Sequence, residues 1–198
     1  VALFESVFNL LEAVIPEFDG AGEIRQPAGS TVTGIVPTNT YRCADGKYVI
    51  IGGNGDSIFK RLMTTAGRVD LAEDPRLAKN PGRVENEAEI DGAIEAWCAT
   101  LPSPEVLQKL EANRVPCGPI YSAADMMADP HFQARGLFQQ VEINGAPLKI
   151  PAIMPRLGGT PGATRWPGGD AGGDTEAVAR GELGLSEEEF QRLKAEGV

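Results

Sequence analysis

The chain has 198 residues, a formal net charge of -10 and 42% apolar residues. This length fits one domain with or without extensions, and the apolar fraction is sufficient for a buried core. The negative charge opposes binding to nucleic acid or to an anionic membrane surface, since both require a partner of opposite sign. No apolar run reaches the roughly 18 residues of a membrane span, and no signal peptide is recognisable. We therefore expect a cytoplasmic protein that binds neither nucleic acid nor membrane.

The first residues, Val1 to Ile15, place apolar side chains at helical spacing. This predicted helix has no N-cap residue ahead of it, which suggests a sequence cut from a longer chain. Pro16 to Val36 is rich in Gly and Pro and fits an extended connector. We expect residues 1–36 to form an interdomain helix and a connector. The apolar face of the helix comprises Phe4, Val7, Phe8, Leu11, Val14 and Ile15.

A β-hairpin is the next predicted element. Tyr41 to Cys43 and Tyr48 to Ile51 flank Ala44 to Lys47, a turn with Asp-Gly at its centre. Asp56 then stands where an N-cap is expected, ahead of a helix that Gly67 closes.

Two further helices and a strand follow. Asn86 to Glu89 resembles a capping box, and Ser103 with Pro104 suits an N-cap followed by the first helical position. Val115 to Tyr121 is predicted as a strand. Trp97 lies on an apolar helical face and is interpreted as a core residue.

The last part of the predicted small domain contains a short helix and a second hairpin. Ser122 with Asp125 predicts the helix start, and Phe138 to Ile143 with Leu148 to Ile150 predicts a hairpin around Asn144-Gly145. The fold class is therefore α+β, with a small domain over residues 37–150 made of short antiparallel strands and packed helices.

Residues 151–198 are expected to form an extended return arm that ends in helical structure. Pro151 to Gly173 contains four Pro and seven Gly but also isolated large apolar residues, of which Trp166 is the best candidate for docking on another domain. Ser186 to Glu189 is a capping box for the last helix.

One glycine-rich turn is a candidate ligand site. Gly53, Asn54 and Gly55 join the predicted hairpin to the helix at Asp56, and unpaired N–H groups at a helix N-terminus bind anions. The alternative is a tight turn that needs glycine for positive φ. Asp56 at the cap would repel a phosphate, so both readings stay open.

Metal and nucleophilic chemistry have little support. Cys43, Cys98 and Cys117 form no CxxC pair and have no regular metal spacing, so we interpret them as reduced, buried small hydrophobic residues. His131 is the single histidine, and no motif places a serine or cysteine beside it. No catalytic residue, metal site or resident cofactor is predicted in this chain.

Five blocks of the sequence are informative together. Two of them stand out, Asn113 to Ser122 and Asp129 to Gly136. The others are Pro37 to Ile51, Asp74 to Leu77 with Arg83 to Asn86, and Leu183 to Val198. In this order the five blocks resemble the class III CoA-transferases, also called the CaiB/BaiF family, which includes formyl-CoA:oxalate, carnitine and bile-acid CoA-transferases and alpha-methylacyl-CoA racemase.

The resemblance implies the C-terminal part of an enzyme that moves coenzyme A from an acyl-CoA to a carboxylic acid, with the CoA thioester as substrate and no metal or redox cofactor. It implies an aspartyl-CoA thioester on a Rossmann-like domain, and no residue here matches that aspartate. The N-terminal helix and the return arm would dock on that missing domain or on a second chain of an interlocked homodimer. This chain alone is expected to be inactive.

The same resemblance adds a second candidate segment. Gly29, Ser30 and Thr31 fall near the place where some family members carry a mobile run of glycines over the active site, although that run is absent here. The hydroxyl groups could bind a carboxylate substrate, or the segment could be a plain connector. For the whole protein, the alternatives are an acyl-CoA racemase of the same family and a noncatalytic binding or assembly module.

Overall fold

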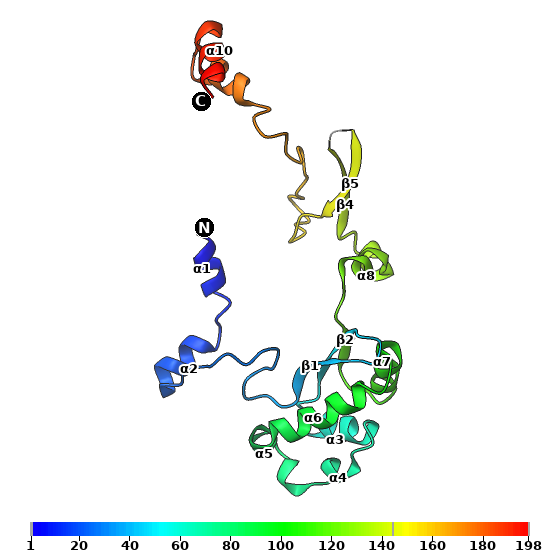
Figure 1. Cartoon of the computed structure of the whole chain (residues 1–198). Coiled ribbons are helices and arrows are strands. Elements are labelled where there is room, and N and C mark those ends of the chain that lie inside the picture. Colours follow the sequence, from blue (N-terminus) through cyan, green and yellow to red (C-terminus); the bar gives the residue numbers. More distant parts are fainter. Residues whose placement is uncertain (1, 144, 198) are drawn as a thin grey trace. The chain divides into compact units, whose positions relative to one another are not determined.

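A computed structural model of the chain describes residues 2–143 and 145–197. The chain divides into two compact units, Val1–Ile120 and Tyr121–Val198, which are described separately below. Helices and short antiparallel strands make up both units (Figure 1), which confirms the α+β class. The predicted domain boundaries at residues 36 and 150 stay predictions.

The N-terminal segment forms two short helices, so the single predicted helix is wrong. Helix α1 spans Leu3–Phe8 and α2 spans Val14–Ala21. The helix predicted up to Ile15 is interrupted between Phe8 and Val14. Pro16 lies in the first turn of α2, where its missing N–H has no cost. The start of the predicted extended connector is therefore helical up to Gly22, whose φ of 71° ends α2.

The first unit contains a three-stranded antiparallel sheet. Strands β1 (Thr38–Arg42) and β2 (Tyr48–Gly52) form the predicted hairpin, and β3 (Cys117–Pro119) pairs with the other edge of β2. The strand predicted over residues 115–121 is shorter than expected, because only Cys117 to Pro119 pair with β2. Gly46 in the hairpin turn has a φ of 78°, a conformation that favours glycine.

Helices from the middle of the chain cover the apolar core of this sheet (Figure 1). They are α3 (Asp56–Thr65), α4 (Val69–Ala72), the 3-10 helix η1 (Pro75–Leu77), α5 (Asn80–Glu85), α6 (Glu87–Cys98) and α7 (Ser103–Ala112). Fully buried side chains from both layers meet in this core, among them Ile51, Leu62, Leu77, Ile94 and Leu110.

Helix α7 is held at both ends by side chains from other elements. At its start, Asp45 accepts hydrogen bonds from the N–H and the hydroxyl of Ser103, at 3.0 and 2.8 Å. At its end, Arg61 of α3 donates to the carbonyls of Asn113 and Arg114, each at 2.9 Å. Pro102, not Ser103, is the N-cap residue, because the Ser103 hydroxyl bonds Asp45 instead of the helix main chain. Arg114 has a φ of 55°.

The second unit contains two short helices, a hairpin and a C-terminal helix. The predicted capping boxes at Ser122 and Ser186 are confirmed, as is the hairpin, although Asn144 in its turn lies outside the described residues. The elements are α8 (Ala123–Ala128), α9 (Pro130–Ala134), β4 (Phe138–Ile143), β5 (Ala146–Pro151), the π-helix η2 (Ala177–Glu182) and α10 (Glu187–Glu196).

Between β5 and η2 the chain is an extended strap, as predicted. Arg156 donates to the carbonyl of Gly136, and Gln139 donates to the Thr164 hydroxyl, so the strap is anchored to its own unit. Its large apolar side chains are exposed, and Trp166 is 65% exposed. The same holds for α1 and α2, in which no described residue is buried; Phe4 is 74% exposed.

Candidate functional site

The two predicted ligand segments both contact the beginning of β1. The N–H of Gly53 donates to the carbonyl of Pro37 at 2.8 Å, and the hydroxyl of Ser30 donates to the amide oxygen of Asn39 at 2.6 Å. Thr38 pairs with Gly52 across the hairpin, so this is the open end of the β1–β2 hairpin. Residues that the sequence suggested separately therefore border one end of the sheet.

The turn from β2 to α3 uses glycine for close packing. Gly53 is buried, and a Cβ there would lie 2.5 Å from Leu62 Cδ2 and 2.9 Å from Pro37 Cγ. Neither Gly53 nor Gly55 has a positive φ, so the expectation of a turn that needs positive φ is wrong. Gly55 is the N-cap of α3 and has no side chain to cap it, whereas Asn54 is exposed.

A buried arginine holds this turn in place. Arg83 of α5 is 0% exposed. Its guanidinium donates to the carbonyls of Asn54 at 2.7 Å, Val36 at 3.0 Å and Leu77 at 3.1 Å and lies over the ring of Phe59 at 5.1 Å. In the sequence, Arg83 stands out only as part of one of the five blocks that carry the family resemblance. An arginine between Gly82 and Val84 carries no local signal of burial, so its role could not be found from spacing.

Asp56 does not cap α3, contrary to the prediction. Its carboxylate accepts from Lys79 at 2.7 Å and from Arg83 at 3.0 Å. The Lys79 hydrogen bond, followed by that of Arg83, holds the pKa of Asp56 below its ordinary value. Two cations thus surround one carboxylate, and the repulsion of a phosphate by Asp56 is offset.

The Gly29–Thr31 segment is fixed by side chains of β1 and α6. Besides donating to Asn39, Ser30 accepts from the Thr40 hydroxyl at 2.9 Å. The Thr31 hydroxyl donates to the Ala28 carbonyl at 3.0 Å. A carboxylate could take a proton from either hydroxyl only if one of these bonds were broken.

Asp91 of α6 ends the chain of hydrogen bonds that runs from Ser30 through Asn39. It accepts from the Asn39 amide nitrogen at 2.8 Å and from the Tyr41 hydroxyl at 2.7 Å. Burial, followed by the hydrogen bond to Asp91, raises the pKa of Tyr41, so Tyr41 stays a hydrogen-bond donor. Nothing in the sequence around Asp91 indicates this role, because its partners lie on another element.

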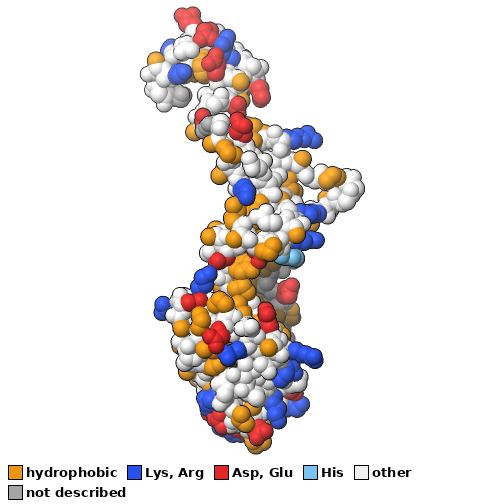
Figure 2. All heavy atoms as spheres, turned by 90° about the vertical axis from the view of Figure 1, so that its right-hand side faces the viewer, with side chains coloured by type: hydrophobic (Ala, Val, Ile, Leu, Met, Phe, Trp, Pro, Cys, Tyr) orange, Lys and Arg blue, Asp and Glu red, His pale blue; other side chains and the backbone are white. Residues whose placement is uncertain are grey.

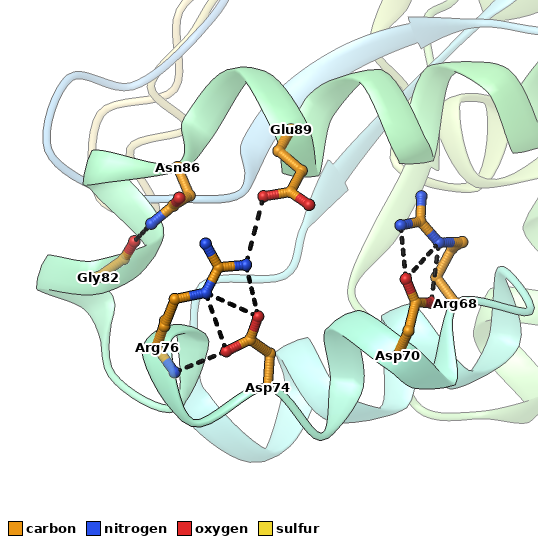
Figure 3. A network of polar contacts seen from close by, with 7 residues as sticks. All are labelled: Arg68, Asp70, Asp74, Arg76, Gly82, Asn86 and Glu89. Carbon is orange, nitrogen blue, oxygen red and sulfur yellow. Dashed lines mark hydrogen bonds and ion pairs between the residues drawn. The ribbon is translucent and has the colours of Figure 1, made fainter.

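A second polar network joins η1, α5 and α6 (Figure 3). Asp74 caps η1 through the N–H of Arg76 at 2.8 Å and also binds the Arg76 guanidinium, which reaches Glu89 at 3.7 Å. Asn86 donates its amide to the Gly82 carbonyl at 2.7 Å instead of capping α6, so the predicted capping box is wrong. These contacts give a structural role to Asp74–Leu77, one of the sequence blocks that carry the family resemblance.

The cysteines and the histidine form no further centre. Cys43 and Cys98 are buried free thiols and Cys117 is half-buried. Burial raises the pKa of Cys98 to about 12, which disfavours the reactive thiolate. His131 is exposed at the start of α9, where its main-chain N–H donates to the carboxylate of Asp129. Within residues 2–143 and 145–197, no three His, Cys, Asp or Glu side chains are grouped to hold a metal ion.

On the face shown in Figure 2, acidic and basic side chains are interspersed, with apolar side chains between them. None of the helices in the described parts of the chain is long and apolar enough to cross a membrane.

The family model for CoA-transferase family III, which describes the sequences of that family, matches residues 1–175. The chain belongs to this family. The family relationship confirms the resemblance found in the sequence and gives the CoA-transferases as the enzymes to which this fold is related.

Curated relatives agree with this assignment. A succinyl-CoA–D-citramalate CoA-transferase of Chloroflexus aurantiacus is 36% identical over 199 aligned residues, which cover 100% of this chain and 50% of the relative. A formyl-CoA:oxalate CoA-transferase of Streptomyces avermitilis is 34% identical, with 94% of this chain and 46% of the relative covered. The CoA-transferase family III chain described here thus spans about half the length of the curated relatives it matches.

Solved structures show the same fold. A CaiB/BaiF family protein from Brucella suis matches with a TM-score of 0.68 and 30% identity, over 92% of this chain and 47% of that protein. A Mycobacterium tuberculosis protein with 21% identity matches with a TM-score of 0.67, over 89% of this chain and 46% of that protein. The second likeness concerns the fold alone.

Proposed function

We propose that this chain is the C-terminal part of an enzyme that transfers coenzyme A from an acyl-CoA to a carboxylic acid. The observation that carries the proposal is the family match over residues 1–175, together with 36% identity to a CoA-transferase along the whole chain. Relatives named for succinyl-CoA with citramalate or malate make succinyl-CoA the first donor to test and hydroxylated dicarboxylic acids the first acceptors.

The chemistry needs an activated acyl carrier. In the proposed reaction, an aspartate outside this chain attacks the acyl-CoA carbonyl, CoA thiolate leaves, and a mixed anhydride forms. The thiolate then attacks the aspartyl carbonyl, which releases the donor acid and leaves an aspartyl-CoA thioester. The acceptor carboxylate attacks that thioester, the C–S bond breaks, and CoA thiolate leaves as a second mixed anhydride forms. The thiolate finally attacks the acceptor carbonyl of this anhydride. This yields the new acyl-CoA and frees the aspartate.

The carboxylates of this chain that precede helices or turns are poor candidates for that nucleophile. Asp45 is held by Ser103, Asp56 by Lys79 and Arg83, and Asp129 by Tyr121 and the His131 N–H. These hydrogen bonds lower the pKa of each of the three carboxyl groups. A carboxylate stabilised in this way is a weaker nucleophile, which supports placing the chemistry elsewhere.

With the nucleophilic aspartate outside this chain, the open end of the β1–β2 hairpin borders the substrate. Gly29, Ser30 and Thr31 on one side and Gly53, Asn54 and Gly55 on the other are the proposed substrate-facing or CoA-facing residues. Arg83 and Asp91 hold these two segments in place. No resident metal or redox cofactor takes part in the proposed reaction.

We also propose that the full-length protein is a cytoplasmic, interlocked homodimer in which α1, α2 and the strap are covered by protein. The support is their exposed apolar side chains, since Leu3 is 90% and Trp166 is 65% exposed. Sedimentation of the full-length protein should give a dimer at micromolar concentration. A compact monomer would contradict the proposal.

The deciding experiment compares the full-length protein with the 198-residue chain. Each is incubated with succinyl-CoA and a panel of carboxylic acids, including citramalate and malate, and acyl-CoA species are followed by mass spectrometry. We expect new acyl-CoA from the full-length protein, none from the chain alone, and none when the upstream aspartate is changed to Ala. Turnover by the chain alone, or an adduct on one of its own carboxylates, would place the chemistry here. Inversion of a 2-methylacyl-CoA without transfer would indicate the racemase.

A further inference from the structure

The hydroxyl groups of the Gly29–Thr31 segment direct their protons at protein acceptors. A hydroxyl has one proton and two lone pairs. The proton of Ser30 lies toward the Asn39 amide oxygen, 2.6 Å away, and one lone pair accepts from Thr40 at 2.9 Å. The Thr31 proton is used on the Ala28 carbonyl. Toward solvent, Ser30 therefore presents a lone pair.

This polarity depends on the orientation of the Asn39 amide, which two neighbours fix. The carboxylate of Asp91 can only accept, so the amide NH2 faces it at 2.8 Å. The main-chain N–H of Thr40 can only donate, so the amide oxygen faces it at 2.7 Å. Both neighbours require the same orientation of the Asn39 amide. In that orientation the amide oxygen also accepts the hydrogen bond from the Ser30 hydroxyl.

Asp91 is itself held in one position. Its other oxygen accepts from Tyr41 at 2.7 Å, and Tyr41 is only 3% exposed. Helix α6, which carries Asp91, packs on β1, which carries Asn39 and Tyr41 at alternate positions on one face. A rigid element is thus connected through Asn39 to an exposed serine.

The outward side of Ser30 is open. Ser30 is exposed, and a Cβ at the preceding Gly29 would meet no described atom within 4 Å. Gly29 has a φ of 66°, a conformation that a residue with a side chain rarely adopts. The segment is therefore accessible to a ligand while its hydroxyl direction is fixed from the inside.

From this geometry we infer that Asp91 is a positioning residue that makes Ser30 a hydrogen-bond acceptor for its ligand. The inference rests on the proposed function, in which this segment borders the substrate. The ligand group beside Ser30 is then a donor, an O–H or an N–H, and not a carboxylate. Such a group is available from two sources: the hydroxyl of a hydroxylated acceptor acid, and the N–H and O–H groups of coenzyme A.

Kinetics of the full-length enzyme separate these two sources. Citramalate and methylsuccinate differ by one hydroxyl and serve as matched acceptors with succinyl-CoA as donor. If the acid hydroxyl binds Ser30, Ser30→Ala lowers kcat/KM for citramalate by about 3- to 10-fold, the value of one hydrogen bond, and leaves methylsuccinate unchanged. If the CoA arm binds there, both acceptors are affected equally and KM for succinyl-CoA rises by a similar factor.

Asp91→Asn tests the positioning role. An amide at this position can donate or accept, so one of the two constraints on the Asn39 amide is removed and the turned-over orientation gains population. The citramalate to methylsuccinate ratio, or KM for succinyl-CoA, should then shift in the same direction as in Ser30→Ala. A merely structural loss would lower activity without changing either quantity. Thr64→Ala, which removes an exposed hydroxyl that bonds the Lys60 carbonyl on α3, is the matched control and should change neither.

A readout independent of activity is exchange of the Thr40 main-chain amide, followed by NMR. Its bond to the Asn39 oxygen should protect it in the wild type and in Thr64→Ala, and exchange should become several-fold faster in Asp91→Asn. Unchanged exchange would overturn the positioning role. Ser30→Ala kinetics within 2-fold of wild type for both acceptors and for succinyl-CoA would overturn the ligand assignment. A wild-type enzyme that transfers CoA to no acid would refute the proposed function and the ligand assignment with it, whereas the exchange result would still decide the role of Asp91.

Discussion

Replacing Arg83 by Met should destabilise the first unit severely. The guanidinium is 0% exposed and donates to three main-chain carbonyls and to Asp56. Met preserves much of the apolar stem but leaves the three carbonyls without the guanidinium donor, and the ring of Phe59 loses its cation. Asp56 keeps its hydrogen bond from Lys79. Loss of a buried, hydrogen-bonded charge of this kind costs about 3–5 kcal/mol. That is a large part of the stability of an ordinary domain.

The matched control is Lys79→Met. Lys79 binds the same carboxylate at 2.7 Å, but its side chain is 79% exposed, so its loss should cost only a small fraction of that of Arg83. Urea denaturation followed by circular dichroism gives both free energies of unfolding, with the m-value as a check that the same unit unfolds. Equal losses in the two variants would refute the reasoning, because burial and the main-chain contacts would then contribute nothing. Arg83→Lys should lie between them, since one ammonium cannot reach all the acceptors of the guanidinium fork.

Three further predictions concern single positions. Gly53→Ala should cost about 1–3 kcal/mol through overpacking, whereas Gly55→Ala, whose Cβ meets only the flexible end of an isoleucine at 3.2 Å, should leave the melting temperature nearly unchanged. A loss of CoA transfer in Gly55→Ala at normal stability would then indicate a ligand-facing turn. Arg114→Gly should be more stable than Arg114→Ala by about 1 kcal/mol, because both lose the side chain but only glycine adopts a φ of 55° without strain; equal urea midpoints would contradict this. The pKa of Asp45 is lowered by its bond from Ser103, so its contribution is present above about pH 4 and lost as the pH falls further. Asp45→Asn should flatten the acid side of the stability curve, and an unchanged acid slope would exclude this role.

Local turn and cap chemistry could be predicted from the sequence where a side chain bonds its own neighbourhood. Asp-Gly in a turn defined the first hairpin, and Ser122 and Ser186 bond the N–H groups three residues ahead of them. The same reasoning failed for Asp56 and Asn86. Their side chains had other partners available, the two cations at Asp56 and the Gly82 carbonyl at Asn86. Competition of this kind depends on tertiary contacts that spacing does not contain.

The candidate site was predictable only in part for a related reason. Glycine at residues 53 and 55 drew attention to the β2–α3 turn. Neither has a positive φ, and Gly53 is required because a Cβ there would collide with Leu62 and Pro37. Arg83 and Asp91 hold the two candidate segments through hydrogen-bond partners between 27 and 52 residues away in the sequence, apart from the nearby Leu77. Neither residue belongs to a local pattern, so only the fold identifies them.

The double attachment of α7 has a consequence for how the first unit opens. A helix with free ends frays, and its terminal amides exchange with solvent through small, local fluctuations. Here the first turn cannot loosen without releasing Asp45 from Ser103, and the last turn cannot loosen without releasing Arg61 from the carbonyls that lead into β3. Helix α7, the hairpin turn and α3 are therefore expected to open as one cooperative block, and β3 remains on the sheet until that block gives way.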